Sequence, residues 1–442
     1  MNERKIASKI LYEIEHNNAY TNIAVSKAFE NGDFSPEEKG FISELVHGVT
    51  ERRITIDYII SQFSKLKLNK IAPNVLNAAR LGIYQILYMD RIPESAAVNE
   101  SVKLAKSAGG QRSAGFVNAI LRNVIRNKNS ISFPADEIEY LSVYYSYPQE
   151  LVTLFVNEFG YDFTEDMFKA FYERRPVTLR CNTLKTTPEK LCSDLKRGNI
   201  DVSLYYSDIF PNINYAICAD KLRNMEKLPS YLNGDFYVQD IAAMLVADVL
   251  NPKSGDTVID MCAAPGGKTT HIAEKMGNNG VIYAFDIHEH KIKLINDNAK
   301  RLGIDICKAT IQDSAVLNEE YIEKADCVLV DAPCSGFGII GKKPDIKYQR
   351  QVSDISDLAG LSFKILSSAA NYVKSGGTLV FSTCTVEKTE NEDVVDKFID
   401  KFGTEFYLEP IKEINKENIG YITLYPHIDG TDGFFICKFK KR

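Results

Sequence analysis

The chain has 442 residues, of which 45% are hydrophobic and 25% charged, and its formal net charge is −6. This composition excludes a disordered chain and is sufficient for two or three domains with cores of their own. No apolar run reaches the ~18 residues that a membrane span needs, and residues 1–9 are polar, so we expect a cytoplasmic protein. Nine cysteines without a C-x-x-C pair argue against a disulfide framework and a structural zinc site.

Residues 1–130 have the pattern of a helical bundle. Isoleucines recur at helical spacing at positions 6, 10 and 14, and Pro36 and Pro73 each begin a further helix. The last two helices are predicted at about 95–107 and 113–127, before a polar linker. We therefore expect a first, all-α domain.

The basic charge of the chain is concentrated in this first domain. Residues 1–128 hold 18 Lys and Arg against 13 Asp and Glu, which leaves 35 against 46 for the remainder. A stretch without any acidic residue, 101–128, contains six cations: Lys103, Lys106, Arg112, Arg122, Arg126 and Lys128. This basic stretch suits contact with nucleic-acid phosphates, although a solvated helix face fits the charge nearly as well.

Residues 131–234 are predicted to form a helical linker and a small α+β module. Two helices separated by Pro148 are followed by a strand at 177–184, a helix at 188–197 and a second strand at 202–206. The module suits contact with RNA through Arg180, Lys185 and Lys196. A role as a spacer or packing domain is at least as compatible with the pattern.

Residues 235–442 alternate between strands and helices. Strands are predicted at 257–261, 281–286, 304–310, 326–331 and 378–384, and helices at 268–276, 288–302 and 355–374. This alternation predicts an α/β domain, with a parallel sheet covered by helices on both faces. The last two strands, at 421–425 and 433–439, are expected to form an antiparallel pair that closes the sheet edge.

Chemically active side chains follow the predicted strand ends. They are Asp260, Asp286, Asp313, Asp331, Cys334 and Cys384. Because the carboxyl ends of parallel strands meet at one edge, these residues are expected to gather where such sheets bind ligands. Asp286 comes 20 residues after Gly266, the spacing at which an acid binds ribose hydroxyls.

The turn after the first of these strands is rich in glycine but fits neither common nucleotide motif. Gly267-Lys268-Thr269 resembles the end of a P-loop, yet Cys262 stands where that motif requires glycine. The dinucleotide fingerprint G-x-G-x-x-G is also absent. A nucleoside triphosphatase and a nicotinamide enzyme are therefore disfavoured. His288 and His290, at the start of a predicted helix and without a nearby cysteine pair, are expected to be surface residues.

Three motifs resemble those of the RNA cytosine-5 methyltransferases, which use S-adenosylmethionine: Met-Cys-Ala-Ala-Pro-Gly-Gly-Lys (261–268), Asp-Ala-Pro-Cys-Ser-Gly (331–336) and Ser-Thr-Cys-Thr-Val (382–386). With an N-terminal domain that resembles NusB, an RNA-binding bundle, the chain is similar to the RsmB (Sun/Fmu) family of 16S rRNA methyltransferases. The resemblance implies a NusB-like domain at 1–130, a small α+β module at 131–234 and a Rossmann-like class I methyltransferase domain at 235–442. Family members often have tryptophan soon after Pro-Asp-Ile, whereas this chain has Tyr348.

Methyl transfer to carbon 5 of cytosine explains the need for these residue types. A thiolate that adds to carbon 6 makes carbon 5 nucleophilic, an acid at nitrogen 3 stabilises the developing charge, and a base removes the carbon-5 proton before the thiolate leaves. Asp331 fits the acid, and either Cys334 or Cys384 suits the attack. The resemblance to the RNA enzymes implies that Cys384 attacks and Cys334 assists release, whereas in the DNA enzymes the Pro-Cys cysteine attacks.

The resemblance also implies the cofactor contacts. The loop of Cys262, Ala263, Ala264, Pro265, Gly266, Gly267 and Lys268 is expected to hold the methionine part of S-adenosyl-L-methionine. Asp286 is expected at the ribose, Asp313 at the adenine and Asp331 between the methyl donor and the base. Lys342 and Lys343 are expected to bind phosphates beside a cytosine that has left its stack.

The implied function is methylation of cytosine 967 of 16S rRNA, either in naked rRNA or in a small-subunit assembly intermediate, by a metal-free monomer. One alternative keeps the chemistry and changes the substrate to tRNA, but the NusB-like domain weighs against it. The other alternative is a non-catalytic RNA-binding scaffold, which would leave both cysteines idle.

Overall fold

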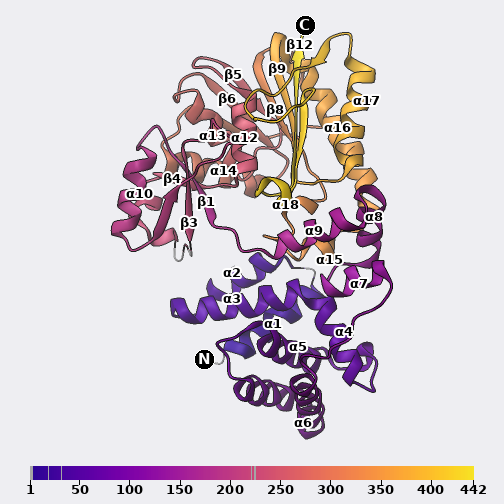
Figure 1. The fold of residues 1–442 in the computed structure, drawn as a ribbon. Coiled ribbons are helices and arrows are strands. Elements are labelled where there is room, and N and C mark those ends of the chain that lie inside the picture. Colours follow the sequence, from indigo (N-terminus) through magenta and orange to yellow (C-terminus); the bar gives the residue numbers. More distant parts are fainter. Residues whose placement is uncertain (1–2, 18, 31, 221, 223–224) are drawn as a thin grey trace. The chain divides into compact units, whose positions relative to one another are not determined.

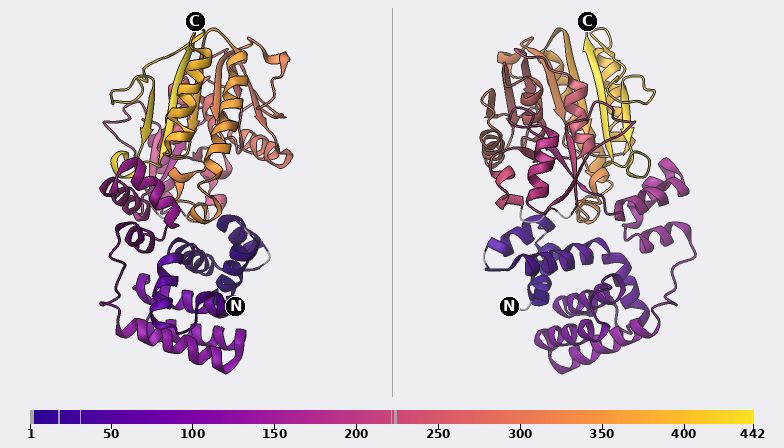
Figure 2. Two further views of the ribbon diagram at one scale, coloured as in Figure 1. Left: turned by 90° about the vertical axis from the view of Figure 1, so that its right-hand side faces the viewer. Right: turned by 60° about the vertical axis from the view of Figure 1, so that its left-hand side comes forward.

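The computed structural model describes residues 3–17, 19–30, 32–220, 222 and 225–442. The chain divides into two compact units, a helical unit (Met1–Phe171 with Ile340–Val352) and a sheet unit (Tyr172–Ile339 with Ser353–Arg442). Figures 1 and 2 show the helices and sheets that make up each of them. None of the described helices is long and apolar enough to cross a membrane.

The helical unit is built around α5, in which every residue from Val75 to Ile86 is buried. Its helices and helical turns are α1 (Glu3–His16), α2 (Thr21–Glu30), α3 (Pro36–Glu51), α4 (Arg53–Phe63), η1 (Leu68–Lys70), α5 (Pro73–Tyr88), α6 (Glu94–Arg126), α7 (Glu137–Tyr144), α8 (Gln149–Phe159), α9 (Tyr161–Tyr172) and α15 (Ile346–Gln349). A capping box begins α3, because Ser35 and Glu38 each accept a hydrogen bond from the backbone N–H of the other. The first domain is therefore all-α, as predicted.

Helix α6 is broken at Gly109 and Gly110, whose backbone angles are not helical. Gly110 has φ +75°, a conformation that side chains other than glycine rarely adopt. The break falls in the gap between the two helices predicted at 95–107 and 113–127, and that prediction is confirmed.

A segment distant in sequence, 340–352, completes the helical unit. Lys347 is buried and donates to the backbone carbonyl of Glu51 at 2.8 Å. Asp345 accepts a hydrogen bond from the backbone N–H of Thr21 at 3.2 Å. The Arg53 guanidinium lies 3.8 Å from the ring centre of Tyr348. Tyr348 is thus held within the helical unit, and one face of its ring is already covered.

The sheet unit begins with a small antiparallel sheet of strand order β2-β3-β1-β4. Its elements are β1 (Val177–Cys181), α10 (Pro188–Arg197), β2 (Asp201–Leu204), β3 (Ala216–Asp220), η2 (Met225–Lys227), α11 (Pro229–Leu232) and β4 (Phe236–Val238). The predicted strands at 177–184 and 202–206 and the helix at 188–197 are confirmed, whereas β3 and β4 were not predicted. The α+β module expected in this region is present.

The large sheet has the strand order β10-β12-β9-β8-β5-β6-β7, with β11 also paired to β12. Its strands are β5 (Thr257–Asp260), β6 (Val281–Asp286), β7 (Cys307–Ile311), β8 (Ala325–Asp331), β9 (Val373–Thr383), β10 (Phe406–Leu408), β11 (Tyr421–Leu424) and β12 (Phe434–Lys441). Strands β5 to β9 are parallel, and β12 runs antiparallel between β9 and β10. The predicted antiparallel pair is confirmed, but β12 lies inside the sheet because the unpredicted strand β10 covers it.

Helices cover both faces of the large sheet (Figure 1). They and the helical turns of this region are α12 (Ile241–Leu250), α13 (Gly267–Lys275), α14 (Glu289–Leu302), η3 (Glu319–Tyr321), η4 (Phe337–Ile339), α16 (Asp354–Tyr372), η5 (Lys388–Glu390), α17 (Glu392–Phe402) and α18 (Pro426–Asp429). Val258 packs in the core beneath α12 and α13, whereas its neighbour Ile259 packs in the core beneath α16 and α17. The predicted doubly covered α/β sheet is confirmed.

Candidate active site at the carboxyl edge of the sheet

The predicted strand-end residues lie at one edge of the large sheet. Asp260, Asp286 and Asp331 are the last residues of β5, β6 and β8, and Cys384 directly follows β9. Strand β5 pairs with β6 on one side and with β8 on the other, so the chain order reverses there. Ligands of such sheets bind beside this reversal, at the carboxyl ends of the strands. We call this edge of the large sheet the strand edge.

The glycine loop, residues 262–268, connects β5 to α13 at the strand edge. The backbone N–H of Ala263 donates to the backbone carbonyl of Phe285 at 2.8 Å, and the backbone N–H of Gly266 donates to the backbone carbonyl of Ala263 at 2.7 Å. Gly266 has φ +97°, and a Cβ on Gly267 would lie 2.9 Å from the ring of Tyr237. The loop needs both glycines, as predicted. Pro265 is exposed, and Cys262, Ala264 and Lys268 are half-buried.

Asp260 places an unsatisfied carboxylate oxygen beside this loop. Its Oδ2 accepts a hydrogen bond from Thr269 at 2.7 Å, whereas the buried Oδ1 lacks a partner among the described residues. Burial raises the pKa of Asp260 to about 7. A cationic ligand would stabilise the ionised carboxylate, so the site fits S-adenosylmethionine, which carries an ammonium and a sulfonium group. The sequence placed Asp260 at the edge but gave it no role.

Asp286 and Asp313 lie along the neighbouring strands β6 and β7. Asp286 is buried, accepts a hydrogen bond from the backbone N–H of His288 at 3.1 Å, and lies 3.6 Å from the Lys291 ammonium. Asp313 is exposed and accepts from the backbone N–H of Ala315 at 3.0 Å. Both carboxylates are thus held by short local hydrogen bonds at the strand edge. The side chain of His288 is exposed, as predicted.

The two cysteines of the motifs meet at the strand edge. Cys334 Sγ and Cys384 Sγ lie 3.4 Å apart, although 50 residues separate them in sequence. The hydrogen bond to Cys384, reinforced by burial, raises the pKa of the Cys334 thiol well above its ordinary value. Cys334 therefore keeps its proton, and either sulfur can donate in the hydrogen bond between them.

Lys268 and Asp331 form an ion pair beside the cysteines. Lys268 Nζ lies 2.6 Å from Asp331 Oδ2, and Ser382 donates to Asp331 Oδ1 at 2.9 Å. Burial alone would lower the pKa of Lys268, but the Asp331 carboxylate outweighs it and the pKa is raised, with a further contribution from Cys384. The site thus places a fixed positive charge near the Cys384 sulfur, which favours the thiolate.

A buried glutamate that the sequence did not single out joins the two cysteine loops. Glu390 accepts hydrogen bonds from the backbone N–H of Ser335 at 2.8 Å and from the Ser335 hydroxyl at 2.5 Å. Ser335 follows Cys334, and its hydroxyl lies 3.0 Å from that of Thr385, which follows Cys384. Burial raises the pKa of Glu390 to about 7. The sequence shows Glu390 only as a glutamate six residues after Cys384, which does not predict its hydrogen bonds to Ser335.

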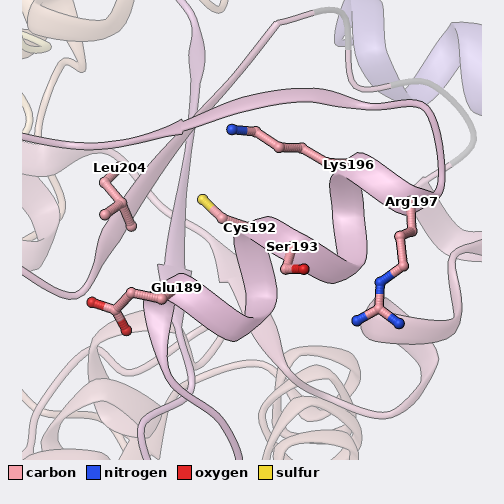
Figure 3. A pocket seen from close by; sticks show the side chains of 6 residues that line it. All are labelled: Glu189, Cys192, Ser193, Lys196, Arg197 and Leu204. Carbon is pink, nitrogen blue, oxygen red and sulfur yellow. The ribbon is translucent and has the colours of Figure 1, made fainter.

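Two of the three cations predicted to contact RNA in the small module are engaged elsewhere. Arg180 is fully buried. Lys185 donates to the backbone carbonyls of Asn233 at 2.7 Å and Arg301 at 3.0 Å. The assignment of Arg180 to RNA was wrong, because its side chain is fully buried, whereas Lys185 is exposed and its contact with RNA stays a prediction. Lys196 is exposed and lines a shallow hollow of about 560 Å³ along α10 with Arg197 and Leu204 (Figure 3).

The remaining predicted RNA contacts lie on the surface of the helical unit. The six cations of the 101–128 stretch are exposed, and Lys103 and Lys128 pair with Glu100 and Glu94. Lys342 and Lys343 are also exposed. Among the residues that the structure describes, no group of three or more His, Cys, Asp or Glu side chains is arranged to hold a metal ion.

Two family models match this chain. Residues 247–440 match the family model described as 16S rRNA methyltransferase RsmB/F, and residues 1–126 match the NusB family. The probable ribosomal RNA small subunit methyltransferase B of Bacillus subtilis is 37% identical over 99% of this chain and 98% of its own length. The counterpart from Synechocystis is 35% identical over 99% of both chains.

Solved structures show the same fold. The crystal structure of PH0851 covers 100% of this chain and 99% of its own, with TM-score 0.83 and 28% identity. That of NSun6 from Pyrococcus horikoshii with SFG, an S-adenosylmethionine analogue, covers 68% of this chain and 99% of its own, with TM-score 0.60 and 27% identity. S-adenosylmethionine is accordingly the methyl donor. The chain belongs to the RsmB/F family of 16S rRNA methyltransferases and carries a NusB-family domain at its N-terminus.

Proposed function

We propose that this rRNA methyltransferase transfers its methyl group to carbon 5 of a cytosine in 16S rRNA, cytosine 967 by family resemblance, through a covalent cysteine adduct. The observation that carries the proposal is the pair of sulfurs 3.4 Å apart beside the Lys268–Asp331 ion pair. A site that only bound RNA would have no use for two adjacent thiols next to a half-buried ammonium group.

Cys384 is the nucleophile in this proposal. The hydrogen bond from Cys334 and the nearby ammonium of Lys268 both stabilise a thiolate on Cys384. The thiolate adds to carbon 6 of the cytosine, which makes carbon 5 electron-rich. When bound, S-adenosylmethionine supplies the methyl group that carbon 5 takes.

Asp331 and Cys334 move the protons. Asp331 faces nitrogen 3, where charge develops as the thiolate adds, and a proton taken up from solvent and held between Asp331 and nitrogen 3 stabilises that charge. The Lys268 ammonium, 2.6 Å from Asp331, stays charged throughout. Cys334 then assists release by hydrogen-bonding to the departing Cys384 sulfur. Water accepts the carbon-5 proton, the electron pair of that bond forms the carbon-5–carbon-6 double bond, and the Cys384–carbon-6 bond breaks to give back the thiolate. Nitrogen 3 returns its proton to solvent. The cofactor is held by the glycine loop, with Asp286 at the ribose and Asp313 at the adenine.

The division of labour follows the three predicted regions. Residues 1–130 and the module at 131–234 hold the rRNA, naked or in an assembly intermediate, and residues 235–442 carry the methyl transfer. The exposed cations of α6 supply the phosphate contacts. A monomer acting in the cytoplasm is sufficient for this reaction, because the strand edge draws every proposed catalytic residue from one chain.

A covalent trap tests the mechanism and the substrate together. Cys334→Ala is expressed in cells, the protein is denatured, and any RNA that remains attached is sequenced. Attached 16S rRNA that disappears in Cys334→Ala/Cys384→Ala is the expected result. Attached tRNA would keep the mechanism and replace the substrate. An adduct that instead forms in Cys384→Ala would exchange the two cysteine roles, and a wild-type protein that methylates no RNA would favour the scaffold.

A further inference from the structure

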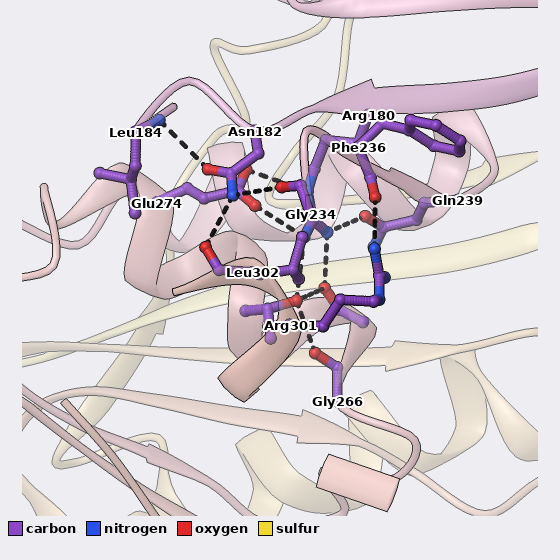
Figure 4. Close-up of polar contacts among 12 residues, drawn as sticks. Arg180, Asn182, Leu184, Gly234, Phe236, Gln239, Gly266, Glu274, Arg301 and Leu302 are labelled. Atoms are coloured by element: carbon purple, nitrogen blue, oxygen red, sulfur yellow. Dashed lines mark hydrogen bonds and ion pairs between the residues drawn. The ribbon is translucent and has the colours of Figure 1, made fainter. Parts of the chain in front are cut away.

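Arg180, on β1 of the small sheet, is a fully buried arginine that reaches the start of α13 (Figure 4). Its Nε and Nη2 bind the two carboxylate oxygens of Glu274 at 3.1 and 3.0 Å. Nη1 donates to the backbone carbonyl of Gly267 at 2.6 Å and also to Gln239, and Nη2 donates to the Thr270 hydroxyl at 2.9 Å. The guanidinium thus joins a buried carboxylate to the glycine loop.

The burial of this cation requires a neutralising partner. The guanidinium spans α13 from Gly267 and Thr270 in the first turn to Glu274, the second-last residue, and without a neutralising charge along this path its burial would be unfavourable. Glu274, one to two turns further along α13, supplies the neutralising charge. A pair serving only stability would be replaceable by apolar side chains, whereas the hydrogen bond to Gly267 requires the arginine.

A second residue of the small sheet also fixes Gly267. Tyr237 stands opposite Arg180 in the β1–β4 ladder, and its ring packs where a Cβ on Gly267 would lie. On the other side of the loop, Asn298 of α14 donates to the backbone carbonyl of Pro265 at 2.9 Å. The loop is therefore held between the small sheet and α14.

The residues directly after β1 bind the end of α14. Asn182 donates to the carbonyls of Gly234 at 2.8 Å and Leu302 at 2.9 Å (Figure 4), and Lys185 binds the carbonyl of Arg301. The carbonyls of Arg301 and Leu302 are at the end of α14, where a cation and amide donors are favoured. Residues 180–185 thus form hydrogen bonds with both helices that border the glycine loop, α13 and α14.

We propose that Arg180 is a positioning residue for S-adenosylmethionine, which fixes the glycine loop in its binding conformation from the small sheet without touching the cofactor. The small sheet is in this respect part of the cofactor site, in addition to its proposed part in holding rRNA. Because the cofactor role of the glycine loop belongs to the proposed function, the test must separate failure of the loop assignment from failure of the arginine assignment.

The test compares cofactor affinity in the full-length protein. Arg180→Leu alone would leave Glu274 buried and unpaired and destabilise the fold, so the informative variant is Arg180→Leu/Glu274→Leu, which removes both charges. Its matched control is Asp57→Leu/Arg80→Leu, which removes a largely buried pair from the helical unit. Binding of S-adenosylhomocysteine is measured by calorimetry, together with KM for S-adenosylmethionine and for rRNA.

We expect Arg180→Leu/Glu274→Leu to melt near wild type yet bind S-adenosylhomocysteine at least roughly tenfold more weakly, the size of one lost charge-assisted hydrogen bond. In this double variant, KM for S-adenosylmethionine is expected to rise in parallel, while KM for rRNA is expected to stay at the wild-type value. The control variant is expected to bind S-adenosylhomocysteine like wild type. Arg180→Lys, which can satisfy Glu274 or Gly267 but not both, is expected to be intermediate. A double variant that binds like wild type would overturn the proposal.

Asp286→Asn distinguishes the two assignments. If Asp286→Asn weakens binding and the double variant does not, the cofactor site stands and Arg180 serves stability alone. If wild type does not bind S-adenosylhomocysteine, the cofactor site itself is elsewhere.

Discussion

The buried Glu390 carboxylate, which joins the Cys334 and Cys384 loops, makes the sheet unit sensitive to pH in a predictable way. Burial, with the Glu387 carboxylate adding to it, raises the pKa of Glu390 from 4.5 to about 7. The folded protein therefore keeps a proton that the unfolded chain releases. The contribution of protonated Glu390 to the free energy of unfolding is complete below pH 4.5 and falls between about pH 4.5 and 7. Above pH 7 the free energy of unfolding no longer changes through this group.

The size of the effect follows from the pKa change. A move from 4.5 to about 7 corresponds to a loss of about 3 kcal/mol between the two pH limits. Glu390→Gln removes the titration but keeps a neutral side chain, which can accept from the Ser335 N–H and donate to its hydroxyl. We expect the variant to match wild type near pH 4.5 and to exceed its thermal midpoint by roughly 6 °C at pH 8.

Calorimetric melting of both proteins between pH 4.5 and 8.5 is the measurement. Asp260, whose pKa is also about 7, lowers stability over the same range, but it is present in both proteins and cancels in the difference. A difference in thermal midpoint between wild type and Glu390→Gln that stays constant from pH 4.5 to 8.5 would refute the reasoning.

Three further predictions concern the other charged sites. Asp57→Ala leaves Arg80 largely buried with only Glu15 as an ion-pair partner, so unfolding of the helical unit by urea should become easier by about 3 kcal/mol, and an unchanged midpoint would contradict this. The affinity of wild type for S-adenosylmethionine should rise roughly tenfold from pH 6 to 8 as Asp260 ionises, and calorimetry should show a flat profile for Asp260→Asn. Arg122→Gln/Arg126→Gln should weaken rRNA binding and reduce the slope of log affinity against log salt by roughly 1.5, whereas an unaltered slope in filter binding would remove α6 from the RNA interface.

The sequence predicted the parts of the fold that have local signatures. The parallel strands are short apolar runs bounded by turns, so β5, β6, β8 and β9 were located closely, and their shared edge followed from topology. The approach of Cys334 to Cys384 was implied by the same reasoning. Strands β4 and β10, with three residues each, are too short to show a period.

Residues that act through distant partners were not predictable in the same way. Arg180 looked like a surface cation because the carboxylate that neutralises it, Glu274, lies 94 residues away. Glu390 sits among other acidic residues near the start of α17, and only its burial against Ser335 distinguishes it. The sequence pattern likewise did not predict the contact between Tyr348 and the Arg53 guanidinium, because 295 residues separate the two in the chain.

The residence of 340–352 in the helical unit sets the order in which the chain can fold during synthesis. Asp345 and Gln349 bond to Thr21 and Ala19, which left the ribosome 324 and 330 residues earlier. At roughly 5–20 residues per second, the N-terminal helices wait roughly 15 to 65 s for this last piece. A fragment ending at Phe171 would never receive it, so the proposed RNA-binding role of the N-terminal region is better tested by point substitution than by truncation.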